Sequence, residues 1–313
     1  MSISRLPTTE PASGKKAART PQAESPLDSA AISGIIIACF AFTFFSCLDT
    51  TAKYLGRELP IIEIVWVRFA SHVVLTAIIF RVWASPQMVM PKRPVLQILR
   101  SFFMLGATAF NFQALRYLQL TDAVSIMFAT PFVVTALAGP MLGEWAGIRR
   151  WSAIMVGFLG VLIITRPGLG GMHWAAIYSV AAMFSYSLYT LTTRMLATTD
   201  TPQSMLVISG VVPTIALAPS AIGNWQMPPD ALSWFLLLMT GVFGSFGHWL
   251  LIKAYVKAPA PIIAPFMYTQ IVSMALLGLI IFGDIPGIYT IAGSSVIIAS
   301  GLYLLYREHF RRG

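Results

Sequence analysis

Ten apolar segments of membrane-spanning length follow one another along this chain. They lie near residues 31–54, 61–83, 94–117, 121–142, 148–165, 173–196, 204–222, 230–256, 260–282 and 287–306. A helix needs about 20 apolar residues to cross a bilayer. The composition agrees, because 57% of the residues are hydrophobic and 11% are charged, whereas soluble domains carry about 25% charged residues. The sequence therefore predicts an all-α membrane protein with ten transmembrane helices, in contact with the lipid bilayer.

Two stretches of the chain match each other without a gap. When residues 114–147 are shifted by 140 positions onto residues 254–287, seven positions agree in kind. Phe128 then meets Tyr268, and Glu144 meets Asp284. Since each half of the chain has five segments, an odd number, the second half must enter the membrane from the opposite side. This arrangement is an inverted repeat, which is typical of secondary transporters with a central binding site.

The repeat predicts how the chain is divided. We expect a disordered cytoplasmic tail at 1–30, a first repeat at 31–166, a linker at 167–172, a second repeat at 173–306 and a basic cytoplasmic tail at 307–313. Residues 1–30 contain no apolar stretch, which argues against a signal peptide. Their Pro, Ala, Ser, Thr and Lys content favours disorder. The Pro and Gly residues near the linker suit a turn.

The distribution of basic residues predicts the orientation of the chain. With the N-terminus inside, 16 of the 21 Lys and Arg residues fall on the inner side, Arg100 among them. The outer side holds Lys53, Arg57, Arg116 and Arg166, and Arg68 lies within a helix. Positive residues accumulate in cytoplasmic loops, so both termini are expected in the cytoplasm. The net charge of +9 thus reflects membrane orientation, and no nucleic-acid partner is expected.

Ionisable residues within a bilayer are costly and call for a partner or a function. Asp49 lies roughly 8 Å from the outer end of the first helix and Arg68 roughly 10 Å from the same side on the second, at about 1.5 Å per residue. An ion pair between Asp49 and Arg68 is therefore predicted. It would serve either as a gate or anchor for a charged substrate group, or as a purely structural pair.

Two further ionisable residues admit alternative interpretations. His72 lies one turn beyond Arg68 and could couple transport to protons, since a histidine titrates near physiological pH. The alternative, which we favour, is a histidine hydrogen-bonded between helices. Lys53 is expected to extend its side chain to the membrane interface, without a direct role in transport.

Aromatic and amide side chains form the remaining candidates for a substrate site. Trp66, Phe128, Tyr189 and Tyr268 could line a site for a flat ring, although aromatic residues also serve as packing and interface anchors. Hydrogen bonds to the substrate could come from four polar residues: Asn111, Gln113, His248 and Gln270. Gln270 gains weight from its mid-helix position, where an unpartnered amide would be unfavourable.

Several short motifs together resemble the drug/metabolite transporter superfamily in its EamA-type branch. They are Ala114-Leu115, Pro131, Gly143-Glu144 and Gly157-x-x-Gly160-Val161. The resemblance implies ten helices in two EamA repeats, cytoplasmic termini and transport of small organic solutes. Ser46-x-x-Asp49-x-x-x-Lys53, Pro60 and Trp66-x-Arg68 look like a bacterial branch that includes riboflavin and S-adenosylmethionine transporters, which implies the cell inner membrane. The second repeat departs from the pattern, because Ile271 replaces Pro131 and a kink there would have to come from Pro265.

These observations favour a secondary transporter that works by alternating access. Uptake of riboflavin or a similar vitamin-like ring compound is the leading hypothesis, and export of amino acids or other metabolites is the alternative. An intramembrane enzyme is disfavoured, because the sequence has no H-E-x-x-H motif and Gly244-Ser245-Phe246-Gly247 lacks the context of a nucleophile elbow. A Ser245–His248 dyad is the one arrangement that would support it. A membrane scaffold is the third class. No cofactor or metal is expected, and the sequence leaves a monomer and a homodimer equally open.

Overall fold

The computed structural model describes residues 29–143, 148–166, 173–196, 199–257 and 264–310, and within them the regular secondary structure is entirely helical. The first repeat contains α1 (Ser29–Leu55), α2 (Ile61–Phe80), the short 3-10 helix η1 (Pro86–Val89), α3 (Pro94–Leu115), α4 (Leu120–Met127), α5 (Thr130–Leu142) and α6 (Ile148–Thr165). The second contains α7 (Ala176–Leu196), α8 (Pro202–Gly223), α9 (Ala231–Lys257), η2 (Ala264–Tyr268), α11 (Thr269–Leu277), η3 (Gly278–Phe282) and α12 (Ile288–Phe310).

The helices follow the predicted segments closely. α1 and α12 extend past the predicted ends of the repeats, to Ser29 and Phe310, while Glu144 and the predicted linker lie outside the described residues. Six spans are long and apolar enough to cross a membrane by length and composition: Ile32–Leu55, Ile61–Phe80, Pro94–Leu115, Leu120–Leu142, Pro202–Gly223 and Ala231–Leu251. Three shorter apolar helices add to these, at Met155–Ile164, Phe266–Phe282 and Ile288–Ser300.

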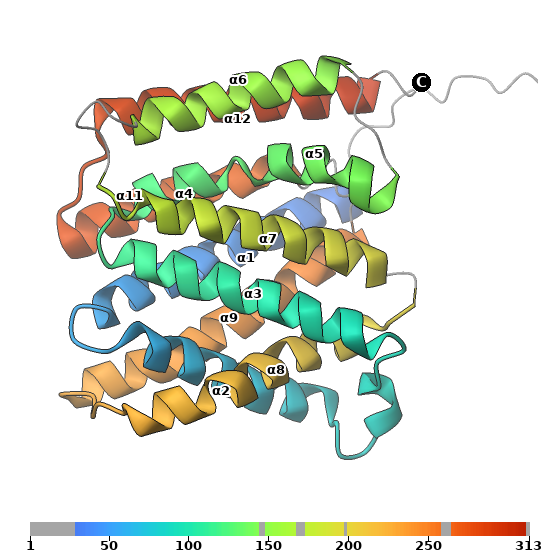
Figure 1. The fold of residues 1–313 in the computed structure, drawn as a ribbon, viewed down its shortest axis with the longest axis vertical. Coiled ribbons are helices and arrows are strands. Elements are labelled where there is room, and N and C mark those ends of the chain that lie inside the picture. The colour runs from blue at the N-terminus through green and yellow to red at the C-terminus, as the bar shows by residue number, and fades with distance from the viewer. Residues whose placement is uncertain (1–28, 144–147, 167–172, 197–198, 258–263, 311–313) are drawn as a thin grey trace, which may run out of the picture.

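Helices of one repeat pack mainly against helices of the other. The largest interfaces join α1 to α9 and α3 to α7, and α6 lies along α12. α2 packs against both α8 and α9. In Figure 1, α6 and α12 form one edge of the bundle, α2 and α8 form the opposite edge, and the other long helices lie between them. The fold is therefore one bundle of interleaved halves rather than two separate five-helix units.

The fourth predicted span is broken in its middle by Pro131. Proline has no N–H to donate and its ring crowds the carbonyl four residues earlier, so α4 ends at Met127 and α5 begins at Thr130. The freed carbonyl of Met127 accepts a hydrogen bond from the Thr130 hydroxyl at 2.6 Å. Such replacement of a lost backbone bond is what allows a broken helix at membrane depth.

The ninth span is broken at the equivalent position, although Ile271 stands where the first repeat has Pro131. A 3-10 turn that includes Pro265 leads into α11 at Tyr268. Tyr268 has φ −68° and ψ −14°, and its counterpart Phe128 has φ −66° and ψ −11°. The Gly residues that end the two spans also agree, with φ 73° at Gly143 and φ 72° at Gly283. The 140-residue shift thus relates backbone geometry as well as sequence.

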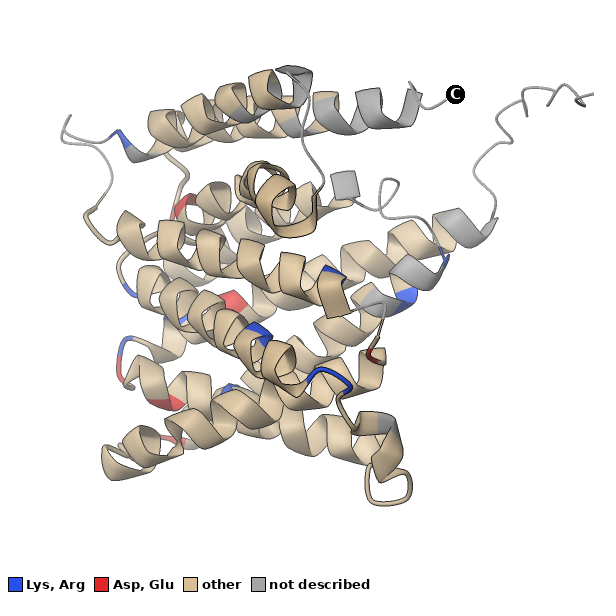
Figure 2. Ribbon diagram, turned by 45° about the vertical axis from the view of Figure 1, so that its right-hand side comes forward, with Lys and Arg blue, Asp and Glu red and all other residues tan. Residues whose placement is uncertain are grey.

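The outer surface of the bundle suits a lipid environment. Large apolar side chains stand exposed on outward faces, among them Phe40, Ile78, Phe158, Phe235 and Ile280. Figure 2 shows most described charged residues near the ends of the helices, with a long uncharged stretch between. An exposed apolar band of this kind matches the hydrocarbon core of a bilayer.

One acidic residue outside the spans joins the two repeats. Asp200, between α7 and α8, is 7% exposed and accepts hydrogen bonds from the Lys92 amide at 2.9 Å and the Gln97 side chain at 3.1 Å. Burial alone would raise the pKa of this carboxyl, but hydrogen bonds from Gln97, Thr199 and the backbone outweigh it and lower the pKa. The charged form is therefore favoured by folding.

Replacing Asp200 by Asn should make stability less dependent on pH. A carboxyl whose pKa is lowered by folding stabilises the protein above its unfolded pKa, near 3.9, and loses that contribution as pH falls through the folded pKa. Asp200→Asn should therefore lower the thermal midpoint of unfolding at pH 7. The difference in midpoint between the wild type and this variant should narrow below about pH 4. The exposed Glu58→Gln is the control. A gap of constant size at every pH would contradict the assignment.

The contact between α6 and α12 should depend on glycine. A Cβ added at Gly160 would lie 2.6 Å from Cγ1 of Ile297 and 2.9 Å from the Gly293 carbonyl oxygen, whereas a Cβ at Gly223 would meet nothing within 4 Å. Overpacking of this kind costs about 1–3 kcal/mol. Gly160→Ala should therefore lower the thermal midpoint of the purified protein in detergent, while Gly223→Ala should not. Equal thermal midpoints for Gly160→Ala and the wild type would refute the close approach of α6 to α12 at Gly160.

Candidate functional site

An internal cavity lies between the two repeats. Its volume of about 170 Å³ far exceeds the roughly 10–15 Å³ that a single water needs. Its polar lining comes mainly from Asp49, Arg68, Thr108, Asn111, His248 and Gln270. Its aromatic lining comes from Phe42, Phe45, Phe112, Phe128, Tyr186 and Tyr189. Apolar walls with a few convergent polar groups are typical of small-molecule sites.

The lining is drawn from equivalent positions of the two repeats. Met127 and Met267 both face the cavity, as do Thr108 with His248 and Thr130 with Gln270, each pair 140 positions apart. The helix breaks beside Phe128 and Tyr268 bring these positions together. The cavity therefore sits at the interface of the repeats, where relative motion of the halves would change its shape.

Seven of the eleven predicted site residues line this cavity: Asp49, Arg68, Asn111, Phe128, Tyr189, His248 and Gln270. The rings of Phe128 and Tyr268 touch edge to face, with centroids 5.2 Å apart and planes at 90°. The repeat thus places these two rings in direct contact, and Tyr268 packs behind Phe128 rather than on the cavity wall where a site residue was expected. Tyr186 stacks beside Tyr189 at 5.7 Å.

The predicted ion pair between Asp49 and Arg68 is not formed. Oδ1 of Asp49 accepts a hydrogen bond from the Asn111 amide at 2.9 Å, and Nε of Arg68 is buried without a hydrogen-bond partner. Both residues nevertheless line the same cavity, as their similar depth on neighbouring helices predicts. Depth along a helix fixes the level of a residue in the membrane. It could not give the direction of each side chain around its helix, and Asn111 of α3 competes successfully for the carboxylate.

Trp66, His72 and Gln113 lie away from the lining of this cavity. The Trp66 indole N–H donates to the Thr214 carbonyl at 2.9 Å. His72 is 3% exposed, with Nε2 3.1 Å from the Leu206 carbonyl oxygen and Nδ1 2.9 Å from the Ser245 hydroxyl. His72 therefore joins three helices, as the structural alternative predicted, and Gln113 is half-buried elsewhere on α3.

Ser245 is paired with His72 and not with His248, which was the dyad considered for an enzyme. The His248 ring instead meets Phe45 edge-on, with centroids 4.9 Å apart. The contact between Ser245 and His72 links α9 to α2 within a buried region. It accounts for the Ser245 hydroxyl as a helix–helix hydrogen bond.

Arg100 was counted among the inner-side charges, and the structure corrects this, because Arg100 is 3% exposed. Its guanidinium donates to the hydroxyls of Thr193, Ser209 and Tyr189 at 2.6, 2.7 and 3.0 Å, and to the Met205 carbonyl at 3.0 Å. The guanidinium carbon Cζ of Arg100 also lies 4.6 Å from the centre of the Tyr189 ring. Arg100 thus holds a wall of the cavity in place, and its position two turns inside an apolar helix was the available signal.

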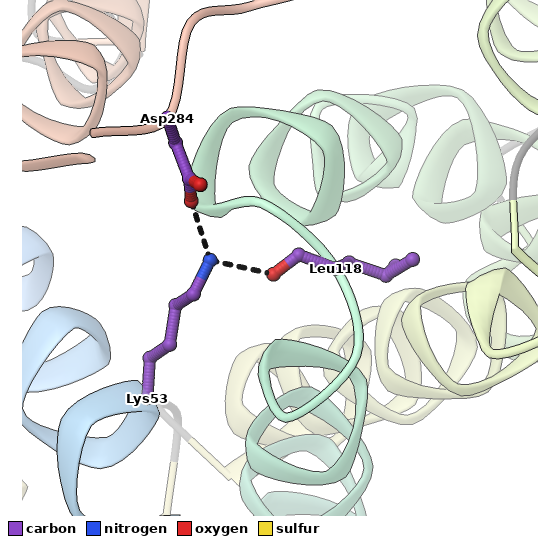
Figure 3. A network of polar contacts seen from close by, with 3 residues as sticks. All are labelled: Lys53, Leu118 and Asp284. Atoms are coloured by element: carbon purple, nitrogen blue, oxygen red, sulfur yellow. Dashed lines mark hydrogen bonds and ion pairs between the residues drawn. The ribbon is translucent and has the colours of Figure 1, made fainter. Parts of the chain in front are cut away.

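Lys53 also departs from its predicted role at the membrane interface. Its Nζ lies 2.6 Å from Oδ2 of Asp284 and donates to the Leu118 carbonyl at 2.9 Å, as Figure 3 shows. The side chains of Lys53 and Asp284 are 12% and 24% exposed. The Phe282 ring lies 4.8 Å from Nζ. This ion pair connects α1 of the first repeat to the segment after η3 of the second.

A helical membrane protein with a cavity between two similar halves has the architecture of a small-solute transporter. The profile of the EamA-like transporter family matches residues 32–166 and 173–307. The chain belongs to that family, with one family repeat in each half.

Several characterised proteins are similar over most of their length. The S-adenosylmethionine uptake transporter of Rickettsia prowazekii is 28% identical over 88% of this chain and 94% of its own. The riboflavin transporter of Vibrio cholerae is 26% identical over 84% of this chain and 90% of its own. The pseudopaline exporter CntI of Pseudomonas aeruginosa is 26% identical over 87% and 95%. A solved crystal structure shares the fold at a TM-score of 0.61 and 15% identity, covering 88% of this chain and 99% of the other.

The Lys53–Asp284 pair should show energetic coupling between the repeats. Lys53→Met and Asp284→Asn should each destabilise the protein, and the double variant should cost less than the sum, with a coupling of about 0.5–3 kcal/mol. Thermal unfolding of the four proteins measures this cycle. The control combines Lys53→Met with Asp230→Asn, since Asp230 accepts a hydrogen bond from the Ser233 amide. Additive effects for Lys53 and Asp284 would show that the contact carries no energy.

Proposed function

We propose that this protein is a secondary transporter that carries a small, ring-bearing metabolite across the bacterial inner membrane by alternating access. The observation that carries the proposal is the cavity lined by equivalent positions of both repeats. A site at the repeat interface can open to either side when the halves rock against each other. The family and its relatives are transporters, which supports this class over an enzyme or a scaffold.

The proposed topology has ten spans in two inverted five-helix repeats, with both termini in the cytoplasm. α5 and η3, which end the equivalent broken spans, finish at opposite ends of the bundle in Figure 1. That arrangement supports an inverted relation between the repeats. The corrected position of Arg100 leaves 15 basic residues on the proposed inner side and 4 on the outer side, so the charge asymmetry still favours this orientation.

In this proposal the ion pair between Lys53 and Asp284 closes the outer end. It joins the two repeats close to the end of α1, beside the Leu118 carbonyl that precedes α4. Alternating access requires contacts that form at one end while the other end opens. Breaking this pair would release α1 from the segment that follows η3.

Two ring-bearing substrates are proposed as candidates. Riboflavin remains a candidate because the aromatic side chains of Phe128, Tyr186 and Tyr189 can stack on a flat ring. S-adenosylmethionine is the second candidate. It is supported by the Asp49 carboxylate in the cavity and by the similarity of this chain to S-adenosylmethionine uptake transporters of Rickettsia. The relatives include uptake transporters and an exporter. We propose uptake, and export of amino acids or other metabolites is the alternative.

The transport proposal is tested with the purified protein in liposomes. Radiolabelled riboflavin and S-adenosylmethionine are offered separately, and uptake is compared with that of empty liposomes. Growth of a riboflavin-requiring strain expressing the protein provides an independent test for riboflavin. Failure of both compounds to move in either direction would refute a ring-bearing substrate of these two kinds.

Removing one aromatic wall should weaken substrate binding. Tyr186→Ala should raise the KM for the transported compound by roughly 2- to 13-fold, because an aromatic stacking contact is worth about 0.5–1.5 kcal/mol. Phe158→Ala, which removes a ring that is 52% exposed on α6, should leave KM unchanged. Equal effects of the two substitutions would contradict a binding role for Tyr186.

A further inference from the structure

Two side chains of opposite charge face the cavity from neighbouring helices of the first repeat. Asp49 lies on α1 and Arg68 on α2, and both belong to its lining. They make no direct ion pair, because Asp49 is hydrogen-bonded to Asn111 instead. Each therefore retains capacity for another partner within the same cavity.

The Arg68 guanidinium is buried, and its Nε lacks a hydrogen-bond acceptor. The residue is 5% exposed, and its Nε is buried with no partner. The guanidinium carbon Cζ of Arg68 lies 4.4 Å from the centre of the Phe69 ring. A Cβ at Gly244 would lie 3.6 Å from both Nε and Nη2, so α9 packs against one side of the group. Buried donors without acceptors are costly, and planar guanidinium groups match carboxylates in geometry.

The Asp49 carboxylate is held through one oxygen. Its Oδ1 accepts the hydrogen bond from Asn111 of α3 at 2.9 Å, which orients the group while leaving its charge unbalanced by direct contact. A buried carboxylate of this kind favours a cationic partner. An ammonium group, with three donors, would supply both charge and hydrogen bonds.

The other charged groups described close to the cavity already have partners. Arg100 makes four hydrogen bonds within the protein, and Lys53 is paired with Asp284. The unsatisfied charges are thus one anion and one cation. An anionic and a cationic side chain that line one cavity without touching suit a ligand that carries both a positive and a negative charge.

We infer that the cavity binds a zwitterionic amino-acid head group, with its carboxylate on Arg68 and its ammonium on Asp49. This inference rests on the proposed transport function and specifies its substrate class. The body attached to the head group lies against the aromatic wall of Phe128, Tyr186 and Tyr189. Riboflavin, a neutral ring compound, offers no opposite charge to either group, so this inference favours S-adenosylmethionine of the two candidate substrates.

Both head-group contacts come from the first repeat. The shift of 140 positions places Tyr189 and Ile208 opposite Asp49 and Arg68. Neither counterpart carries a charge. The charged contacts of the proposed site therefore come from α1 and α2 alone.

The test pairs altered ligands with altered side chains. Binding to the purified full-length chain is measured with S-adenosylmethionine, with its carboxyl methyl ester, with its N-acetyl derivative, and with methylthioadenosine, which keeps the ring and lacks the head group. The wild type should bind S-adenosylmethionine roughly tenfold or more tightly than each of the other three, because each lost charged hydrogen bond weakens binding by about that factor. Arg68→Gln should abolish only the preference for S-adenosylmethionine over its methyl ester. Asp49→Asn should abolish only the preference for S-adenosylmethionine over its N-acetyl derivative.

The controls separate loss of folding from loss of recognition. Arg116→Gln and Glu58→Gln alter exposed charges and should keep the full preference. Arg68→Lys keeps the positive charge and should recover part of the preference against the methyl ester. A purely structural role for Arg68 or Asp49 would weaken all four ligands equally, and that result would overturn the inference.

The outcomes also distinguish this inference from the transport proposal. Liposome uptake is measured in parallel for riboflavin, S-adenosylmethionine and L-leucine. Transport of riboflavin without binding of the zwitterionic ligands would overturn the inference and leave the proposed function standing. Transport of leucine as fast as the ring-bearing zwitterion would support the head-group site and refute the requirement for a ring. Failure of every zwitterion to bind or move would overturn the head-group site.

Discussion

The packing of each repeat against the other is the constraint on which the rest of this structure depends. α1 lies on α9 and α3 on α7, while α2 packs with α8 and α6 with α12. Membrane helices associate through close packing and hydrogen bonds rather than through a hydrophobic effect between them. The main buried cluster accordingly includes residues of both halves, with Met183, Leu237, Met274 and Ile297 of the second repeat packed among residues of the first. The buried polar contacts follow the same rule, since Arg100, His72 and Lys53 each reach into the opposite repeat.

The helix breaks convert this packing into a cavity. An unbroken α4–α5 span would carry its side chains past the centre of the bundle in a regular helical order. The break instead presents Phe128 and Thr130 to the cavity, with the Thr130 hydroxyl replacing the missing backbone donor. The ninth span reaches the same backbone geometry without a proline at position 271, so tertiary packing and the preceding 3-10 turn can produce the break that Pro131 favours locally.

Local pattern predicted the helices well because apolar length and proline positions are short-range properties. The apolar segments and the shift of 140 residues, which pairs Phe128 with Tyr268, could be inferred from the sequence, whereas the contact between these two rings could not. The charged groups were harder, because their partners are distant along the chain. Lys53 and Asp284 are 231 residues apart, and Asn111 displaces Arg68 as the direct partner of Asp49 through a geometry that depth along a helix does not give. The place of Arg100 inside an apolar helix signals its burial, but its partners, Tyr189, Thr193, Met205 and Ser209, are distant along the chain.

The α6–α12 pair explains why family membership is easier to establish than substrate. The Gly157-x-x-Gly160-Val161 motif lies on α6, where Gly160 and Gly293 bring the two backbones together, and neither helix contributes to the lining of the central cavity. The contact that holds these two helices together is therefore physically separate from the cavity. A substitution in the cavity lining, on α1 to α5, α7, α9, η2 or α11, can thus change what is bound and leave the α6–α12 contact intact.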